Sequence, residues 1–163
     1  MNDLIINNLE FAQSHQILVG EIAVLNCERL AKMIAPNLSN GQISYKLTGA
    51  AKQLRNPSLH LHINAKLPVT CQRCLDEMQV QLSLDFSYMV CQTLPIETDE
   101  NDDTDWLEAA ANMNLQELIE DELLLAMPIA PMHELVNGQN CSQQSTQSGE
   151  KPNPFAVLKS LVK

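Results

Sequence analysis

The chain has 163 residues, a formal net charge of −10 and five cysteines. This length suits one domain with appendages, because most domains hold roughly 100–150 residues. No apolar run is long enough to span a bilayer and no charged-then-apolar leader follows Met1, so we expect a cytoplasmic protein. An odd number of cysteines in such a chain favours metal or thiol chemistry over a disulfide framework.

The chain contains both helical and extended sequence patterns. A weakly helical stretch precedes a less regular strand, and Asn26 is placed to cap a helix that Pro36 ends. Three later segments alternate apolar and polar residues with period two, as half-buried strands do. The predicted helices cover residues 9–16 and 27–35, and the predicted strands cover 17–23, 43–48, 58–69 and 78–90.

The last helix is predicted to begin at Asn114, which forms a capping-box pattern with Glu117, and to end at Met127-Pro128. Together these elements predict an α+β fold. Its core would be an antiparallel β-sheet of three to five strands, with flanking helices on the apolar face and a C-terminal docking tail. We expect a single domain over residues 1–136, a polar linker over 137–150 and the tail over 151–163.

Negative charge is concentrated in one segment. Residues 97–122 hold eleven acidic residues and no Lys or Arg, whereas residues 1–96 are electrically balanced. Nucleic acid is bound by Lys and Arg, so this segment should repel RNA and attract a basic protein. A solvated loop that aids solubility is the alternative. The acids expected to bind a partner are Asp102, Asp103, Asp105, Glu117, Glu120 and Asp121.

The pair Cys71-x-x-Cys74 lies in the predicted hairpin loop Thr70–Glu77. A tight turn with this spacing can supply half of a tetrahedral zinc site, and Cys141 and His133 could supply the other half. The alternative is that these cysteines only pack within the turn. A thioredoxin-like redox pair is disfavoured, because such a pair needs a helix N-terminus.

Glu122 falls within the apolar stripe of the last predicted helix. A carboxylate in that position needs a partner, because burying an unpaired charge is costly. Arg73 or a backbone amide could be this partner, which would make Glu122 a structural carboxylate. The alternative is that the helix is rotated, with Leu124 on its buried side.

Enzyme signatures are missing from the chain, which has no glycine-rich phosphate loop, GxSxG or HExxH motif. The expected polar sheet face also lacks the aromatic residues that stack on bases in sheet-type RNA-binding proteins. We therefore expect a binding protein and no catalytic residues. A nuclease or RNA-modifying enzyme stays an alternative, for which no cluster of metal-binding carboxylates is evident.

The tail after the linker is apolar again. Pro152 and Pro154 favour an extended approach, and a short amphipathic helix follows that is too short to be stable alone. It would dock on its own sheet or in a groove of a partner. The tail residues expected to make this contact are Pro154, Phe155, Leu158 and Leu161.

Three motifs in this order, Cys71-x-x-Cys74-Leu75, Glu120–Pro128 and Lys151–Leu161, give the chain a family resemblance from about Gly20 onward. It resembles the YceD family, whose role is accumulation of large-subunit (23S) ribosomal RNA. Other branches of that family carry extra cysteine pairs in the region of Met132–Cys141, which suggests metal binding there.

The resemblance implies a ribosome biogenesis factor needed for synthesis, processing or stability of 23S rRNA. Combined with the charge pattern, it leads us to expect action through a basic large-subunit protein or an assembly intermediate, with indirect contact to the RNA. The alternative is a zinc- or thiol-dependent RNA-binding or regulatory protein centred on the CxxC hairpin.

Overall fold

The computed structural model describes residues 4–34, 41–51, 56–94, 105–134 and 141. The chain divides into two compact units, Met1–Met132 and His133–Lys163. All the described helices and strands belong to the first unit. The expected linker and tail fall outside the described residues except for Cys141, so the predicted domain boundaries stay predictions.

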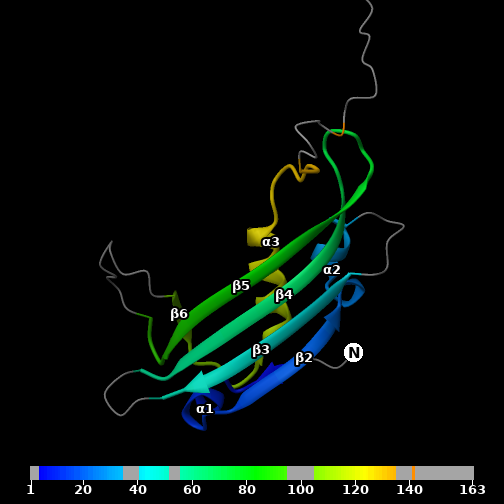
Figure 1. Ribbon diagram of the computed structural model, residues 1–163. Coiled ribbons are helices and arrows are strands. Elements are labelled where there is room, and N and C mark those ends of the chain that lie inside the picture. Colours follow the sequence, from blue (N-terminus) through cyan, green and yellow to red (C-terminus); the bar gives the residue numbers. More distant parts are fainter. Residues whose placement is uncertain (1–3, 35–40, 52–55, 95–104, 135–140, 142–163) are drawn as a thin grey trace, which may run out of the picture. The chain divides into compact units, whose positions relative to one another are not determined.

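A five-stranded sheet in the order β2-β3-β4-β5-β6 forms the centre of the first unit (Figure 1). Strands β2 to β5 are antiparallel neighbours, as predicted, whereas β6 runs parallel to β5. The α+β prediction is therefore confirmed, with one parallel edge strand added. The strands are β2 (Ile17–Ala23), β3 (Gln42–Ala50), β4 (Ser58–Thr70), β5 (Glu77–Cys91) and β6 (Asp105–Glu108).

Shorter elements complete this unit. A second, two-stranded sheet pairs β1 with β7. None of the described helices is long and apolar enough to cross a membrane. These remaining elements are β1 (Ile5–Ile6), α1 (Asn8–Gln13), the 3-10 helix η1 (Val24–Asn26), α2 (Glu28–Ala31), β7 (Met113–Asn114) and α3 (Leu115–Ala126).

The period-two pattern of the strands divides the sheet into an inner, buried face and an outer, polar face. Helices α2 and α3 lie on the inner side (Figure 1). Each fully buried Leu or Ile there contributes roughly 1.5–3 kcal/mol to stability. The inner residues of β4 are all buried, namely Leu59, Leu61, Ile63, Ala65, Leu67 and Val69, and they join Leu115, Ile119 and Leu123 of α3 in one core.

The two predicted helix caps have different outcomes. Asn114 caps α3 as predicted, since its Oδ1 accepts hydrogen bonds from the backbone N–H groups of Gln116 and Glu117 at 3.1 and 3.4 Å. The prediction that Asn26 caps the second helix is wrong. Asn26 lies in η1, and α2 follows an N-cap, Cys27, that makes no side-chain cap hydrogen bond.

Candidate functional site

The β4–β5 hairpin ends in a tight turn that carries the CxxC pair. The N–H of Cys71 donates to the carbonyl of Asp76 at 2.9 Å, and the N–H of Leu75 donates to the carbonyl of Cys71 at 3.0 Å. Leu75 adopts a left-handed conformation with φ of 65° to close the turn. The N–H of Arg73 points at Cys71 Sγ from 3.5 Å, an orientation that favours a metal-bound thiolate sulfur.

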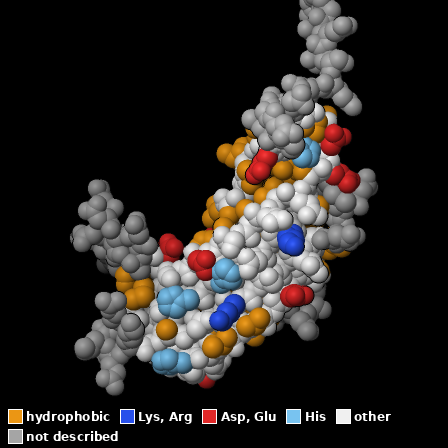
Figure 2. Space-filling model, viewed as in Figure 1, with side chains coloured by type: hydrophobic (Ala, Val, Ile, Leu, Met, Phe, Trp, Pro, Cys, Tyr) orange, Lys and Arg blue, Asp and Glu red, His pale blue; other side chains and the backbone are white. Residues whose placement is uncertain are grey.

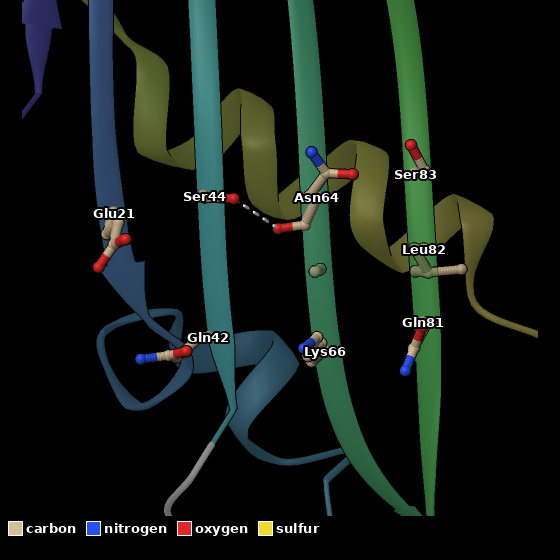
Figure 3. A pocket seen from close by; sticks show the side chains of 9 residues that line it. Glu21, Gln42, Ser44, Asn64, Lys66, Gln81, Leu82 and Ser83 are labelled. Atoms are coloured by element: carbon tan, nitrogen blue, oxygen red, sulfur yellow. Dashed lines mark hydrogen bonds between the residues drawn. The ribbon is translucent and has the colours of Figure 1, made fainter.

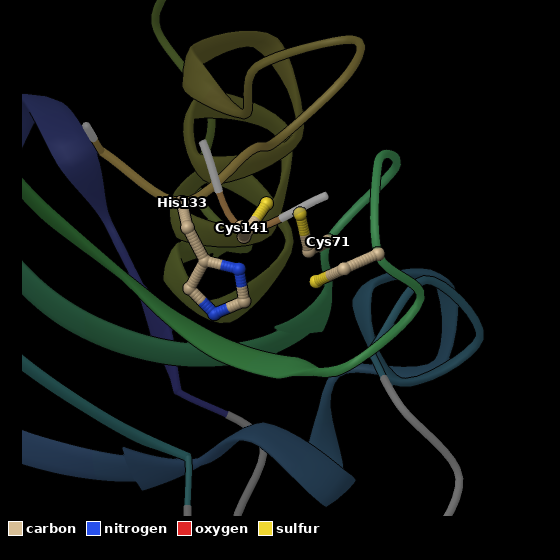
Figure 4. A group of neighbouring side chains, drawn as sticks. Cys71, His133 and Cys141 are labelled. Carbon is tan, nitrogen blue, oxygen red and sulfur yellow. The ribbon is translucent and has the colours of Figure 1, made fainter. Parts of the chain in front are cut away.

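The tip of this hairpin is joined to the segment that follows α3. The N–H of Gln72 donates to the carbonyl of Pro131 at 2.8 Å, and Arg73 Nη2 lies 3.4 Å from Met132 Sδ. His133 is the next residue of the chain. The four residues predicted as metal ligands, Cys71, Cys74, His133 and Cys141, offer ligand atoms that all lie within 4.8 Å of one another. Figure 4 shows Cys71, His133 and Cys141 pointing toward a common centre.

Three cysteines and one histidine fit a zinc ion. Zinc in structural sites is bound tetrahedrally, at about 2.3 Å from sulfur and about 2.0–2.1 Å from nitrogen. In such a site, any two of the four ligand atoms are roughly 3.3–3.8 Å apart. The four ligand atoms here lie within 4.8 Å of one another, which is about 1 Å longer than those distances. The residues lie close enough to bind a metal, and a Cys₃His set that filled all four positions would make the site structural.

Among the described residues, Glu120 of α3 is the one buried carboxylate, with 5% of its surface exposed. Its Oε1 accepts hydrogen bonds from the backbone N–H groups of Arg29 and Leu30, at 2.7 and 2.9 Å. These groups begin α2, where the N-cap residue supplies no acceptor. Glu120 therefore satisfies, from a different helix, the orphan N–H groups that a cap residue normally satisfies.

Arg29 completes this arrangement, which we call the Glu120 clamp (Glu120, Asp121, Arg29 and the N–H of Leu30). Its Nη2 and Nε lie 3.1 and 3.2 Å from Glu120 Oε2, and its Nη1 contacts Asp121 Oδ1. Next to the clamp, burial and the Glu120 carboxylate raise the pKa of the Cys27 thiol to about 11. Cys27 is therefore a packed, unreactive thiol at neutral pH.

Glu122 has a different partner from the one predicted. Its Oε1 accepts a hydrogen bond from the Tyr88 hydroxyl at 2.7 Å, across the interface between α3 and β5. Burial, followed by this carboxylate, raises the pKa of Tyr88. Arg73 lies at the hairpin tip beside Met132, so the suggested pairing of Glu122 with Arg73 is wrong. Glu122 thus makes a structural hydrogen bond, but Glu120 is more buried and makes more hydrogen bonds.

The acids predicted to bind a partner are divided by the structure. Asp105 and Glu117 are exposed. Glu120 is buried in the clamp, so the prediction that it binds a partner is wrong, and Asp121 is paired with Arg29. The other predicted contact residues, Asp102, Asp103, Pro154, Phe155, Leu158 and Leu161, lie outside the described residues.

The outer face of the sheet carries mostly uncharged polar side chains (Figure 2). A hollow of about 520 Å³ on it is lined by β2, β3, β4 and β5 (Figure 3). In this hollow Ser44 Oγ donates to the carbonyl of Asn64 at 3.4 Å. Its lining offers hydrogen-bonding groups for a polar partner, from Glu21, Gln42, Ser44, Asn64, Ala65, Lys66, Gln81, Leu82 and Ser83.

A second hollow of about 240 Å³ lies on the same face and contains both strand histidines. His60 Nδ1 lies 2.8 Å from Ser87 Oγ, and His62 Nδ1 lies 2.6 Å from Asp85 Oδ1. Each His is the direct cross-strand neighbour of its partner in the β4–β5 register. These contacts are therefore those that opposed polar side chains make on a sheet surface.

Comparisons with known proteins agree with the motifs described above. No solved structure matches the chain. A protein of Haemophilus influenzae named Large ribosomal RNA subunit accumulation protein YceD is 29% identical over 171 aligned positions, which cover 97% of this chain and 94% of that protein. The family model described as Large ribosomal RNA subunit accumulation protein YceD matches residues 59–162, more than half of the chain. The chain therefore belongs to the YceD family.

Proposed function

We propose that this protein is a ribosome biogenesis factor that supports the accumulation of large-subunit ribosomal RNA without catalysing a reaction. The name of the family and of the H. influenzae relative supports the link to this RNA. The protein would act through a basic large-subunit protein, whose positive surface it would shield until that protein meets the RNA. Loss of the factor would then lower 23S rRNA through failed assembly and decay.

The observation that carries this mechanism is the position of exposed negative charge. Asp105 and Glu108 are the exposed first and last residues of β6, and Glu117 is exposed on the first turn of α3. Eight further acids lie between residues 97 and 122 of the sequence, among them Asp102 and Asp103, although Glu120 of this set is buried and Asp121 is paired with Arg29. The acids of β6 therefore place negative charge on an edge strand of the sheet, and exposed charge of one sign attracts a basic partner and speeds the encounter with it.

A tagged pull-down from growing cells tests this proposal, with protein and RNA identified in the eluate at low and moderate salt. We expect a basic large-subunit protein that is lost as salt rises, because exposed charges are screened. The variant Asp105→Asn/Glu117→Gln should weaken its capture. The variant Glu10→Gln/Glu28→Gln removes the same charge at other exposed positions and serves as the matched control. Capture of 23S rRNA that survives removal of protein would overturn the mechanism.

A second proposal concerns the hairpin tip, where we infer that Cys71, Cys74, His133 and Cys141 bind zinc. Support comes from the donor set and from the distances of up to 4.8 Å between ligand atoms. The metal would supply structure and hold the turn to the chain that follows α3. This role is compatible with the first proposal, since a structural ion stabilises the protein without taking part in a reaction.

Metal analysis of the purified protein tests the zinc proposal directly. We expect about one zinc per chain, and a large loss of it in Cys74→Ser, since a missing ligand opens the tetrahedral site. Cys91→Ser changes a thiol outside the cluster and should leave the zinc content unchanged. Protein purified under reducing conditions without added chelator that contains no metal, and gains none from zinc-supplemented buffer, would refute the proposal.

A further inference from the structure

The outer edge of β2 has unusual backbone exposure. Two hydrogen bonds flank its ladder with β3, from the N–H of Gly49 to the carbonyl of Gln16 at 2.8 Å and from the N–H of Val24 to the carbonyl of Gly41 at 3.4 Å. The register between them is continuous. Hydrogen-bonded and non-bonded pairs alternate in an antiparallel ladder, so even-numbered β2 residues bond to β3. The odd-numbered residues, Ile17, Val19, Glu21 and Ala23, direct their N–H and C=O groups away from the sheet.

In the described part of the chain, β2 pairs with β3 alone. Edge strands are normally protected by Lys, Pro, bulges or shortness. β2 has seven residues, has none of these features and contains a single charge, Glu21. Ile17 and Val19 are 62% and 68% exposed, and hydrophobic side chains gather over β2 in Figure 2. The opposite edge strand, β6, has four residues and an acid at each end.

We propose that β2 pairs in antiparallel fashion with β2 of a second copy of this chain, about a twofold axis at Gly20. The outward-facing residues then oppose one another: Val19 faces Glu21 of the second copy, and Ile17 faces its Ala23. Four outward residues per copy, each with one donor and one acceptor, would form about eight backbone hydrogen bonds. Two five-stranded sheets would become one continuous sheet with a shared outer face.

Self-complementarity favours a second copy as the occupant of this edge. In the register about Gly20 the acids do not face each other, whereas an axis at Glu21 would oppose two carboxylates. Lys46 is the cross-strand neighbour of Val19 in the β2–β3 register. Val19 in turn faces Glu21 of the second copy, so Lys46 and that Glu21 lie on either side of Val19 and carry opposite charges. A basic peptide would find only one acid on this strand.

The inner side of the strand is compatible with the axis at Gly20. The ring of Tyr45 covers Gly20 there, and a Cβ at this position would lie 2.5 Å from the Tyr45 hydroxyl. Tyr45 itself is buried, so the edge is already packed on its inner face before a second strand arrives. Among the described residues, none pairs with its outward backbone groups, and Ile17 and Val19 stay 62% and 68% exposed.

Sedimentation of the full chain over a wide concentration range tests the proposal. We expect a monomer–dimer equilibrium that strengthens as salt screens the net charge of −10. Val19→Glu places a carboxylate opposite Glu21 twice per dimer and should weaken association by about tenfold or more. Within the monomer this new acid lies beside Lys46, so the fold should persist. The double variant Val19→Glu/Glu21→Lys pairs opposite charges across the axis and should restore the dimer.

Thr48→Glu is the matched control, because it adds the same charge to the same face on the neighbouring strand β3. Amide exchange gives an independent reading: the N–H groups of Val19 and Glu21 should be protected only in the dimer, and those of Leu18 and Ile22 in both forms. A protein that is monomeric at every concentration overturns the proposal. So does a dimer that Val19→Glu leaves intact, since its interface would lie elsewhere.

Discussion

Replacing Glu120 by Ala tests the claim that a carboxylate of α3 caps α2. The change leaves the N–H groups of Arg29 and Leu30 without their acceptor, and Leu30 is fully buried. A buried donor that loses its partner costs about 1–3 kcal/mol, and the loss of a helix cap about 1 kcal/mol. The guanidinium of Arg29 is half exposed, so we assign its ion pair no further energy. We therefore expect Glu120→Ala to lower the free energy of unfolding by about 2–4 kcal/mol.

Urea denaturation followed by circular dichroism measures this loss from the midpoint and the slope of the transition. Glu117→Ala serves as the control, because it removes an exposed carboxylate from the first turn of the same helix and should cost no more than about 1 kcal/mol. Glu120→Gln keeps one carbonyl acceptor and should lie between the two. Equal effects of Glu120→Ala and Glu117→Ala would refute the capping role.

Three further changes have clear expected outcomes. Asn114→Ala removes the α3 cap and should lower the free energy of unfolding by about 1 kcal/mol in the same assay. Gly49→Ala places a Cβ 2.3 Å from the backbone carbonyl oxygen of Phe11, so the backbone must shift and we expect a loss of about 2 kcal/mol or more. The pKa of the Cys27 thiol is about 11 in the folded protein and 9.0 in the unfolded chain. Because the unfolded chain loses this proton first, the contribution of Cys27 to stability is complete below pH 9 and is lost as pH rises from 9 to 11. Relative to wild type, Cys27→Ala should show a shallower fall of stability across that window, and an unchanged fall would contradict the assignment.

Much of the fold follows from local sequence, because period-two alternation is a direct consequence of strand geometry. The strands β3, β4 and β5 were predictable for this reason, and Asn114 carries its own cap signal. The parallel strand β6 was not, since only Trp106 and Leu107 stand between two acids and no alternation can be read from four residues. The length of α2 also escaped prediction, since the helix ends at Ala31, before the predicted end at residue 35. Nor could the local sequence indicate that the acceptor for its first N–H groups is a carboxylate ninety residues away.

The carboxylates of α3 show why a helical wheel was insufficient. Leu115, Ile119 and Leu123 define the centre of the buried stripe. At about 100° per residue, Glu120 lies about 100° to one side of that centre and Glu122 about 60° to the other side. The wheel therefore places Glu122 nearer the buried stripe than Glu120, whereas in the structure Glu120 is the more buried of the two. Their different roles come from tertiary packing, with α2 against Glu120 and Tyr88 against Glu122.

The metal-ligand set was predictable in a different way, because sulfur and imidazole groups are rare and their chemistry is specific. Cys71, Cys74, His133 and Cys141 were grouped from their types and their predicted loops, and the structure brings them together. The polar hollow on the outer sheet face was not predicted as a site. Its only sequence signal is the run of Ser, Asn, Gln and Lys at alternate strand positions.

The lengths of the strands indicate what a metal at the hairpin tip would do. The β3 ladder ends at the pair Gln42–Lys66, so the last residues of β4 and the first of β5 pair only with each other among the described strands. A two-stranded ribbon is marginally stable in water. If zinc holds its tip, chelation should raise amide exchange in the distal arm, at Leu67 and Val80, and leave Leu61 and Leu84 in the central sheet protected. Equal loosening of both regions, or of neither, would show that the ion is not a clamp on the arm.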